Sequence, residues 1–413
     1  MVVSGLYYNI MSYFETSKIA AADGPSIDAF GRWRVSGITT LFDSKQLHDT
    51  GSINWATKII GNATCSYVQD LASVKMITSG SNSSVIRQSR RRFNYQPGKS
   101  QLIVCTGNFG SHSHANCIER IGYFDERDGL FFEVSGSTLN TAVRSGGTTT
   151  YVSQSNWNLD TFNGRGVSGN TIDISKSQIY FFDFEWLGVG RVRYGIFQGG
   201  IPYYVNQITN INALTEEECV YMQTPNLPVR YEIINSGSSN GTLYHICSAV
   251  ASEGGIERNG PYRSIDIPGQ GTLTINNGVY AAALAIRLKP GYLDTTVIPI
   301  NISMDNNAGN NGWKWTLLLN PTTGSAFTWA DLRDSAVQWA TGSNSITIID
   351  EGIKIVSGYV TPTADTATVT FNNDPSLSIG SSIDGASDTL VLAISNFGLN
   401  TTFRTAMQFQ ETI

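Results

Sequence analysis

Four arginines and a lysine lie close together in the segment 87–99, and this spacing could form an anion-binding site. The basic residues are Arg87, Arg90, Arg91, Arg92 and Lys99. The chain as a whole is acidic, with 33 Asp and Glu residues against 27 Lys and Arg residues and a net charge of -6. Binding to nucleic acid depends on surplus basic residues that neutralise phosphates, so we expect no nucleic-acid partner.

The arginines are instead expected to form ion pairs. Successive side chains of a strand point to opposite faces, so Arg87 and Arg91 fall on one face, while Arg90 and Arg92 fall on the other. Arginines on both faces cannot all reach one ligand. We therefore predict that one set pairs with carboxylates inside the subunit and that the other set contacts an acidic surface of a neighbour.

Asp183 and Glu185 are the carboxylates whose spacing best suits hydrolysis. Glycosidases use two carboxyl groups about 5 to 10 Å apart, and residues two positions apart on one strand lie at roughly 7 Å. Sandwich glycosidases tend to carry a third acid at the next alternate position, which here is Leu187. The pattern therefore predicts no catalytic residue and no enzymatic activity.

Structural ion pairs are the expected role of these carboxylates. If residues 188–190 form a three-residue turn, Glu185 lies opposite Arg193, and Leu187 lies opposite Arg191. Opposite charges that face each other across two strands stabilise the pairing. Asp183 is expected to contribute to the same ion-pair group.

Two cysteines and two histidines fall within thirteen residues: Cys105, His112, His114 and Cys117. Thiolate and imidazole are preferred zinc ligands, but this spacing matches no standard zinc site. We expect a polar loop without a metal, and His112 and His114 are the alternative as metal ligands. The five cysteines are odd in number and include no CxxC pair, which favours reduced thiols.

No cofactor is expected either. The glycine-rich stretches GVG and GQG lack the strand-to-helix context of a phosphate-binding loop. No GxSxG nucleophile elbow stands out, and the stretch SGSSNG (236–241) indicates a turn or loop tip.

The composition predicts an all-β protein. Short apolar or alternating runs are bounded by Gly, Asn and Ser, and 41 glycines and 11% aromatic residues suit turns and half-buried strands. We predict an extended N-terminal arm over 1–50, a jelly-roll-like β-sandwich over 51–258, a linker over 259–278 and a second β-sandwich domain over 279–413. A short helix is expected near 329–340. No apolar stretch is long enough for a membrane helix, and the N-terminus lacks the pattern of a signal peptide.

Aromatic residues could stack on sugars if they were exposed. Trp313 and Trp315 alternate and so share one face of a strand, which is also what a sandwich core requires. Tyr203, Tyr204 and Trp157 allow the same two interpretations. We expect core packing for these rings, with sugar stacking as the alternative.

Several long motifs resemble a family of virion structural proteins of tailed phages and large aquatic viruses. The resemblance covers most of residues 25 to 260. Its clearest stretches are RQSRRRFNYQPGKSQLIV (87–104), DFEWLGVGRVRYG (183–195) and TPNLPVRYEI (224–233). It implies a particle component built from β-sandwich domains, and it carries over no catalytic residue.

The resulting expectation is a structural component of a virus particle: an oligomeric tail, baseplate, fibre or head-surface protein. It would be made in the host cytoplasm, reside in the virion and contact other virion proteins. A homo-oligomer, with a trimer favoured, is expected to form through interfaces rich in Tyr, Trp and Arg, and no membrane partner is expected. The alternative is an adhesin or depolymerase that recognises a host surface glycan.

Overall fold

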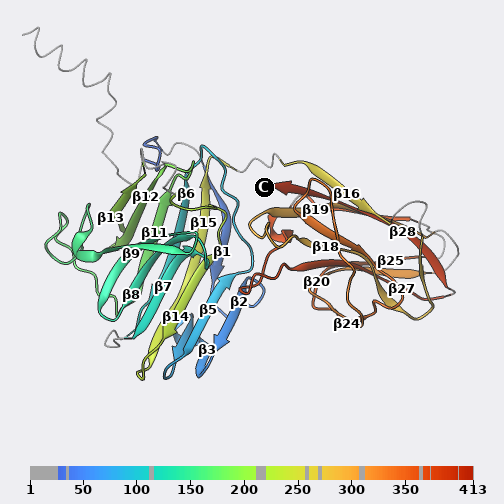
Figure 1. Ribbon diagram of the computed structural model, residues 1–413, viewed down its shortest axis with the longest axis horizontal. Coiled ribbons are helices and arrows are strands. Elements are labelled where there is room, and N and C mark those ends of the chain that lie inside the picture. The colour runs from blue at the N-terminus through green and yellow to red at the C-terminus, as the bar shows by residue number, and fades with distance from the viewer. Residues whose placement is uncertain are drawn as a thin grey trace, which may run out of the picture. The chain divides into compact units, whose positions relative to one another are not determined.

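The computed structural model describes residues 27–33, 37–110, 116–210, 220–255, 260–267, 272–306, 312–361, 366–372, 374–398 and 400–412. The chain divides into two units. The first comprises residues 1–89 and 95–257, and the second comprises residues 90–94 and 258–413. In the described part of the chain, no helix is long and apolar enough to cross a membrane. The fold is all-β with sandwich-like units, as the sequence predicts (Figure 1).

The first sheet of the first unit, sheet I, is antiparallel. Its strands are β1 (Ile38–Lys45), β3 (Ala63–Val68), β4 (Ser73–Thr78), β6 (Gln101–Asn108), β11 (Gln178–Phe184), β12 (Arg191–Gln198), β13 (Ile201–Thr209) and β15 (Gly241–Glu253). They follow the order β13-β12-β11-β6-β15-β4-β3, and β1 pairs with β15. Short 3-10 turns, η1 (Gln69–Leu71) and η2 (Gln154–Asn156), connect strands of this unit.

The second sheet of the first unit, sheet II, is also antiparallel. Its strands are β2 (Trp55–Ile60), β5 (Ser83–Ser89), β7 (Cys117–Phe124), β8 (Gly129–Ser135), β9 (Thr138–Ser145), β10 (Thr148–Ser153) and β14 (Val229–Asn235). They follow the order β10-β9-β8-β7-β14-β5-β2.

An aromatic core joins the inner faces of sheets I and II. Alternate residues of β11 point inward, and the ring centroids of Tyr180 and Phe182 lie 4.9 and 5.4 Å from that of Phe132 on β8. Farther along β11, Phe184 lies 5.9 Å from Tyr123 of β7. The two-residue period therefore directs every second side chain of these strands into one core.

The second unit also holds two main antiparallel sheets. Sheet III has the order β16-β28-β19-β26 with β17 paired to β28, and its strands are β16 (Tyr262–Asp266), β17 (Leu273–Ile275), β19 (Thr296–Asn306), β26 (Thr366–Thr370) and β28 (Thr401–Thr412). Sheet IV has the order β22-β23-β18-β27-β20-β25, and its strands are β18 (Tyr280–Leu288), β20 (Trp313–Leu319), β22 (Ala330–Asp331), β23 (Val337–Thr341), β25 (Ile353–Val360) and β27 (Thr389–Asn396). A small pair, β21 (Thr322–Thr323) and β24 (Ile348–Asp350), and the 3-10 turn η3 (Pro375–Leu377) complete this unit.

The tryptophans of β20 lie in the core of the second unit. Trp313 is fully buried and Trp315 is 6% exposed, and both belong to the apolar cluster between sheets III and IV. Trp157 is likewise buried in the first unit. Core packing, and not sugar stacking, is the role of these three rings.

The structure differs from the sequence prediction in three segments. Residues 38–45, assigned to an arm, form β1 in sheet I, and residues 262–266 and 273–275, assigned to a linker, form β16 and β17. The expected helix near 329–340 is the hairpin of β22 and β23. Ala336, Val337 and Ala340 are buried there, because a short apolar pattern fits either a helix or a strand.

A glycine in sheet II gives the first stability prediction. A Cβ atom at Gly122 of β7 would lie 2.2 Å from the carbonyl oxygen of Leu130 and 2.6 Å from Cα of Phe131. Gly122→Ala should therefore lower the free energy of unfolding by about 1–3 kcal/mol, measured by urea denaturation. Gly37→Ala is the matched control, because a Cβ there meets no atom within 4 Å; equal losses in the two variants would contradict the prediction.

Candidate functional site

Asp183 and Arg193 form a fully buried ion pair between β11 and β12. Asp183 Oδ1 accepts a hydrogen bond from Ser100 Oγ at 2.6 Å, and its Oδ2 accepts one from the Tyr204 hydroxyl at 3.1 Å. Arg193 Nη2 also donates to the carbonyl of Ile27 at 2.9 Å. This carboxylate is therefore saturated with donors and closed to a substrate.

Glu185 lies beyond the end of β11, opposite Arg191. The backbone N–H of Glu185 donates to the Arg191 carbonyl at 3.1 Å, and the Arg191 N–H donates to Glu185 Oε1 at 3.3 Å. The prediction that Glu185 lies opposite Arg193 is thus wrong. The turn spans Trp186 to Gly190 and is longer than the three residues expected, so Asp183 is the residue opposite Arg193. Asp183 is fully buried and held by Arg193, so Asp183 and Glu185 do not form an accessible catalytic pair.

The Arg191 side chain anchors the segment that precedes β1. Its guanidinium donates to the backbone carbonyls of Ala29 and Asp28. Desolvation by burial raises the pKa of the neighbouring Glu185 carboxyl, and the hydrogen bond from the Arg191 backbone opposes that shift. Arg191 therefore links the segment that precedes β1 to β12, and Glu185 accepts a hydrogen bond from the backbone of Arg191.

The arginine run does not form one continuous strand. β5 ends at Ser89, and Arg90–Asn94 belong to the second unit, where the Arg90 carbonyl accepts a hydrogen bond from the Ser381 N–H at 3.3 Å. The Arg91 guanidinium lies 5.9 Å from the centre of the Phe93 ring. Burial is the main cause that lowers the pKa of Arg91, and the charge of Asp374 opposes it. Arg92 is half-buried, as are Arg90 and Arg91.

Arg87, by contrast, lies inside the sandwich of the first unit. It is fully buried and donates to the Thr50 carbonyl at 2.6 Å, to Thr57 Oγ1 at 3.1 Å and to His245 Nδ1 at 3.3 Å. Burial, followed by the charge of Arg87, lowers the pKa of His245 well below its ordinary value. Arg87 is a structural residue of the core and is not available to a ligand.

A charged row on the outer face of sheet II was missed by the sequence analysis. Arg120 of β7 lies in register between Glu133 of β8 and Glu232 of β14 and binds each carboxylate at 2.7 Å. Arg230 adds bonds to Glu126 at 2.8 Å and to Glu232 at 3.3 Å. Glu133 and Glu232 are almost fully buried, so this row is also closed. The alternation of Arg230 and Glu232 was the signal that could have revealed it.

The cysteine and histidine group can be described only in part. Cys105 and Cys117 are buried free thiols, and burial raises the pKa of each to about 12. His112 and His114 lie outside the described residues. In the part of the chain that the structure describes, no group of three His, Cys, Asp or Glu side chains is arranged to hold a metal ion.

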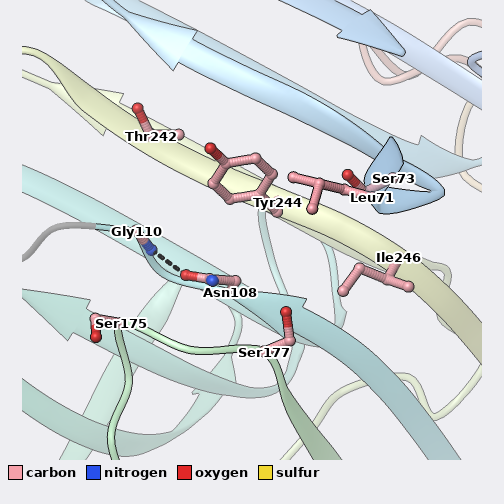
Figure 2. Close-up of a pocket in the computed structure, with 9 residues that line it drawn as sticks. All are labelled: Leu71, Ser73, Asn108, Gly110, Ser175, Ser177, Thr242, Tyr244 and Ile246. Carbon is pink, nitrogen blue, oxygen red and sulfur yellow. Dashed lines mark hydrogen bonds between the residues drawn. The ribbon is translucent and has the colours of Figure 1, made fainter. Parts of the chain in front are cut away.

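A hollow on the outer face of sheet I has the geometry of a binding site (Figure 2). Its volume is about 430 Å³, and none of the described side chains that line it is charged. The lining residues come from η1, β4, β6, β15 and the loop before β11: Leu71, Ser73, Asn108, Gly110, Ser175, Ser177, Thr242, Tyr244 and Ile246. We call this hollow the sheet I pocket.

Strand register brings these residues together. Thr242 and Tyr244 alternate along β15 and so share its outer face, and Asn108 of β6 lies directly opposite Tyr244. Ile246, at a β-bulge between His245 and Cys247, continues this alternation and lines the same wall. The pocket therefore combines segments that lie far apart in the sequence.

The polar groups of the pocket are suited to hydrogen bonding with an uncharged ligand. Asn108 Oδ1 accepts a bond from the Gly110 N–H at 2.6 Å, as Figure 2 shows, which leaves the amide NH₂ as a donor. Ser73 is only 1% exposed, and its Oγ has no hydrogen-bond partner in the described part of the chain. A buried hydroxyl without a partner costs free energy, which a ligand hydroxyl would recover. The Tyr244 ring adds an apolar surface.

Glu119 lies on the inner side of the sheets and supports one wall of this pocket. It is 4% exposed, and it accepts a hydrogen bond from the backbone N–H of Thr242. The Cys117 thiol lies 3.9 Å from Glu119 Oε1. Burial raises the pKa of Glu119 to about 9, so the carboxyl is protonated and neutral near pH 7.

No protein-family model matches this chain, and no curated protein sequence matches it. Solved structures give only weak likenesses. A laminarinase from Rhodothermus marinus has a TM-score of 0.37 and 9% identity over 53% of this chain and 98% of its own. A putative beta-glucanase from Mycobacterium abscessus has a TM-score of 0.35 and 11% identity over 51% of this chain and 100% of its own.

A viral protein gives a likeness of the same strength. The CBM2 module of the evolved Dit of Lactobacillus casei phage J-1 has a TM-score of 0.32 and 6% identity over 54% of this chain and 98% of its own. At such scores these likenesses carry no argument about a ligand or a reaction. The matched structures include a laminarinase and a glucanase, which runs against the expectation of no enzymatic activity without assigning a reaction to this chain.

The buried ion pair gives a prediction on stability. Asp183→Ala or Arg193→Ala should each lower the free energy of unfolding by about 3–5 kcal/mol, because each leaves one buried charge without its partner. The double variant Asp183→Leu, Arg193→Met should lose much less than the sum of the two single losses. Urea denaturation measures the free energy of unfolding of all three variants. If the double variant loses as much as the two single variants together, the two side chains act independently and the prediction is wrong.

The Glu119 carboxyl gives a prediction on pH. Its pKa is about 9 in the folded protein and near 4.5 when unfolded, so the folded state retains a proton that the unfolded state releases. The contribution of Glu119 to stability is complete below pH 4.5 and falls as the pH rises towards 9. Glu119→Gln should weaken this pH dependence and increase stability near pH 7. Urea unfolding of both proteins between pH 4.5 and 9 tests this prediction. If the free energy of unfolding of Glu119→Gln changes with pH as steeply as that of the wild type, the prediction is wrong.

Proposed function

We propose that this chain is a component of a virus particle. We also propose that the first unit of the chain binds an uncharged glycan in the sheet I pocket. The sequence motifs that resemble virion structural proteins support the particle role. The observation that supports glycan binding is the pocket itself, where the buried Ser73 hydroxyl has no hydrogen-bond partner among the described residues and the described lining side chains are uncharged.

The pocket chemistry fits a sugar better than other small molecules. Sugar hydroxyls both donate and accept hydrogen bonds, and the side chains of Ser73, Asn108 and Thr242 offer both kinds of partner. The apolar face of a sugar ring can pack on an aromatic ring such as Tyr244. The described lining side chains are uncharged, and one cation lies near them, because the Lys75 ammonium is 5.7 Å from the centre of the Tyr244 ring.

Glycan binding is tested with two pocket variants. Tyr244→Ala and Asn108→Ala should each weaken the affinity for the glycan identified on an array by tenfold or more, equivalent to ~1.4 kcal/mol, measured by isothermal titration calorimetry. Tyr151→Ala is the control, because Tyr151 is an exposed tyrosine on β10 of the other sheet. Unchanged affinity in both pocket variants would exclude this site. Release of reducing sugar from the same glycan separates cleavage from binding.

The particle role has its own measurement. Mass spectrometry of purified virions should find the chain, and light scattering of the isolated protein should show a homo-oligomer, for which we propose a trimer. A stable monomer that is absent from virions would contradict this half of the proposal. That result would not affect the test of glycan binding with the pocket variants.

A further inference from the structure

A strip of aromatic and basic side chains, exposed at one end and half-buried along the rest, crosses the outer face of sheet IV in the second unit. Strand register places Tyr359 of β25 opposite Lys314 of β20, Lys314 opposite Ser395 of β27, and Ser395 opposite Tyr280 of β18. Four neighbouring strands thus contribute one residue each to a straight row. The row is about 14 Å long, from three interstrand spacings of ~4.8 Å. We call it the sheet IV strip.

One end of the strip is an aromatic platform. Tyr359 is 72% exposed, and Phe397, which follows β27, is 56% exposed. Their ring centroids lie 6.1 Å apart with only 24° between the ring planes. Two large rings held nearly parallel and open to solvent present a continuous apolar surface, which is typical of a binding site.

The middle of the strip is basic. Lys314 Nζ lies 5.4 Å from the centre of the Tyr280 ring and 3.7 Å from Glu351 Oε1. Lys354 forms a second ion pair with the same Glu351, and the Tyr280 hydroxyl donates to Glu351 Oε1 at 3.1 Å. Two ammonium groups thus share one carboxylate, so the charged side chains of this cluster carry a net charge of +1.

We propose that the sheet IV strip binds an acidic polysaccharide whose sugar rings bear carboxylates. The apolar faces of the sugar rings would pack on Tyr359 and Phe397, and a sugar carboxylate would pair with Lys314. The length of the row accommodates more than one sugar unit. This ligand differs in charge from the one proposed for the sheet I pocket, so the two sites are independent.

Titration with a uronic-acid polymer tests the proposal. The full chain should bind polygalacturonate through this strip. The affinity of the strip for neutral dextran should be at least tenfold weaker. The double variant Tyr359→Ala, Phe397→Ala and the single variant Lys314→Met should each weaken polygalacturonate binding at least tenfold. Added salt should weaken the wild-type interaction and affect the Lys314→Met variant less.

Matched controls separate the possible outcomes. Tyr262→Ala removes a tyrosine that is 66% exposed on β16 of sheet III, and Tyr244→Ala disables the sheet I pocket; both should retain polygalacturonate binding. Unchanged melting temperatures would show that the strip variants fold. Retained binding in the strip variants, or equally tight binding of dextran and polygalacturonate by the Tyr244→Ala variant, would overturn the proposal. A strip variant that changes only the oligomeric state would also overturn it, because the strip would then be an interface between copies.

Discussion

The two-residue alternation of side chains along each strand is the constraint on which the rest of the structure depends. In the first unit it directs Tyr180 and Phe182 of β11 towards Phe132, and it sends Asp183 to the opposite face. In the second unit it buries Trp313 in the core and places its half-buried neighbour Lys314 on the outer face. Each sheet therefore supplies one face to a core and carries its polar groups on the other face, which in sheet IV also holds a second apolar cluster.

The outer faces use that chemistry in two ways. At Asp183–Arg193 and along the Glu133–Arg120–Glu232 row, every charge is paired and nearly all are buried, so these groups fix strand positions. At the sheet I pocket the polar groups are uncharged, and the Ser73 hydroxyl has no partner in the described part of the chain. Saturated groups stabilise a fold, whereas groups left with spare hydrogen-bonding capacity are suited to a ligand.

The sequence predicted the features that depend on local pattern. Alternation between turns predicted the all-β class, and the spacing of Trp313 and Trp315 predicted a shared buried face. It did not predict the pairing of Glu185, because the turn after β11 includes Leu187 and Gly188 with positive φ and is longer than a three-residue turn. Turn length sets hairpin register, and a small change in it moves every opposing pair.

The candidate sites depend on contacts that no local pattern reveals. The sheet I pocket joins Ser73, Asn108 and Tyr244, which come together only through the order of β4, β15 and β6 in the sheet. The sheet IV strip likewise needs four strands in register. The arginine run was misread as one strand, because the chain leaves β5 at Ser89 and Arg90–Asn94 join the second unit.

Hydrogen–deuterium exchange in the presence of a bound uncharged oligosaccharide tests the central claim most directly. If the sheet I pocket holds the ligand, backbone amides in segments 71–73, 108–110 and 242–246 should exchange more slowly, while β2 and β10 of sheet II remain unchanged. Protection confined to the outer face of sheet II or to the second unit would contradict the claim.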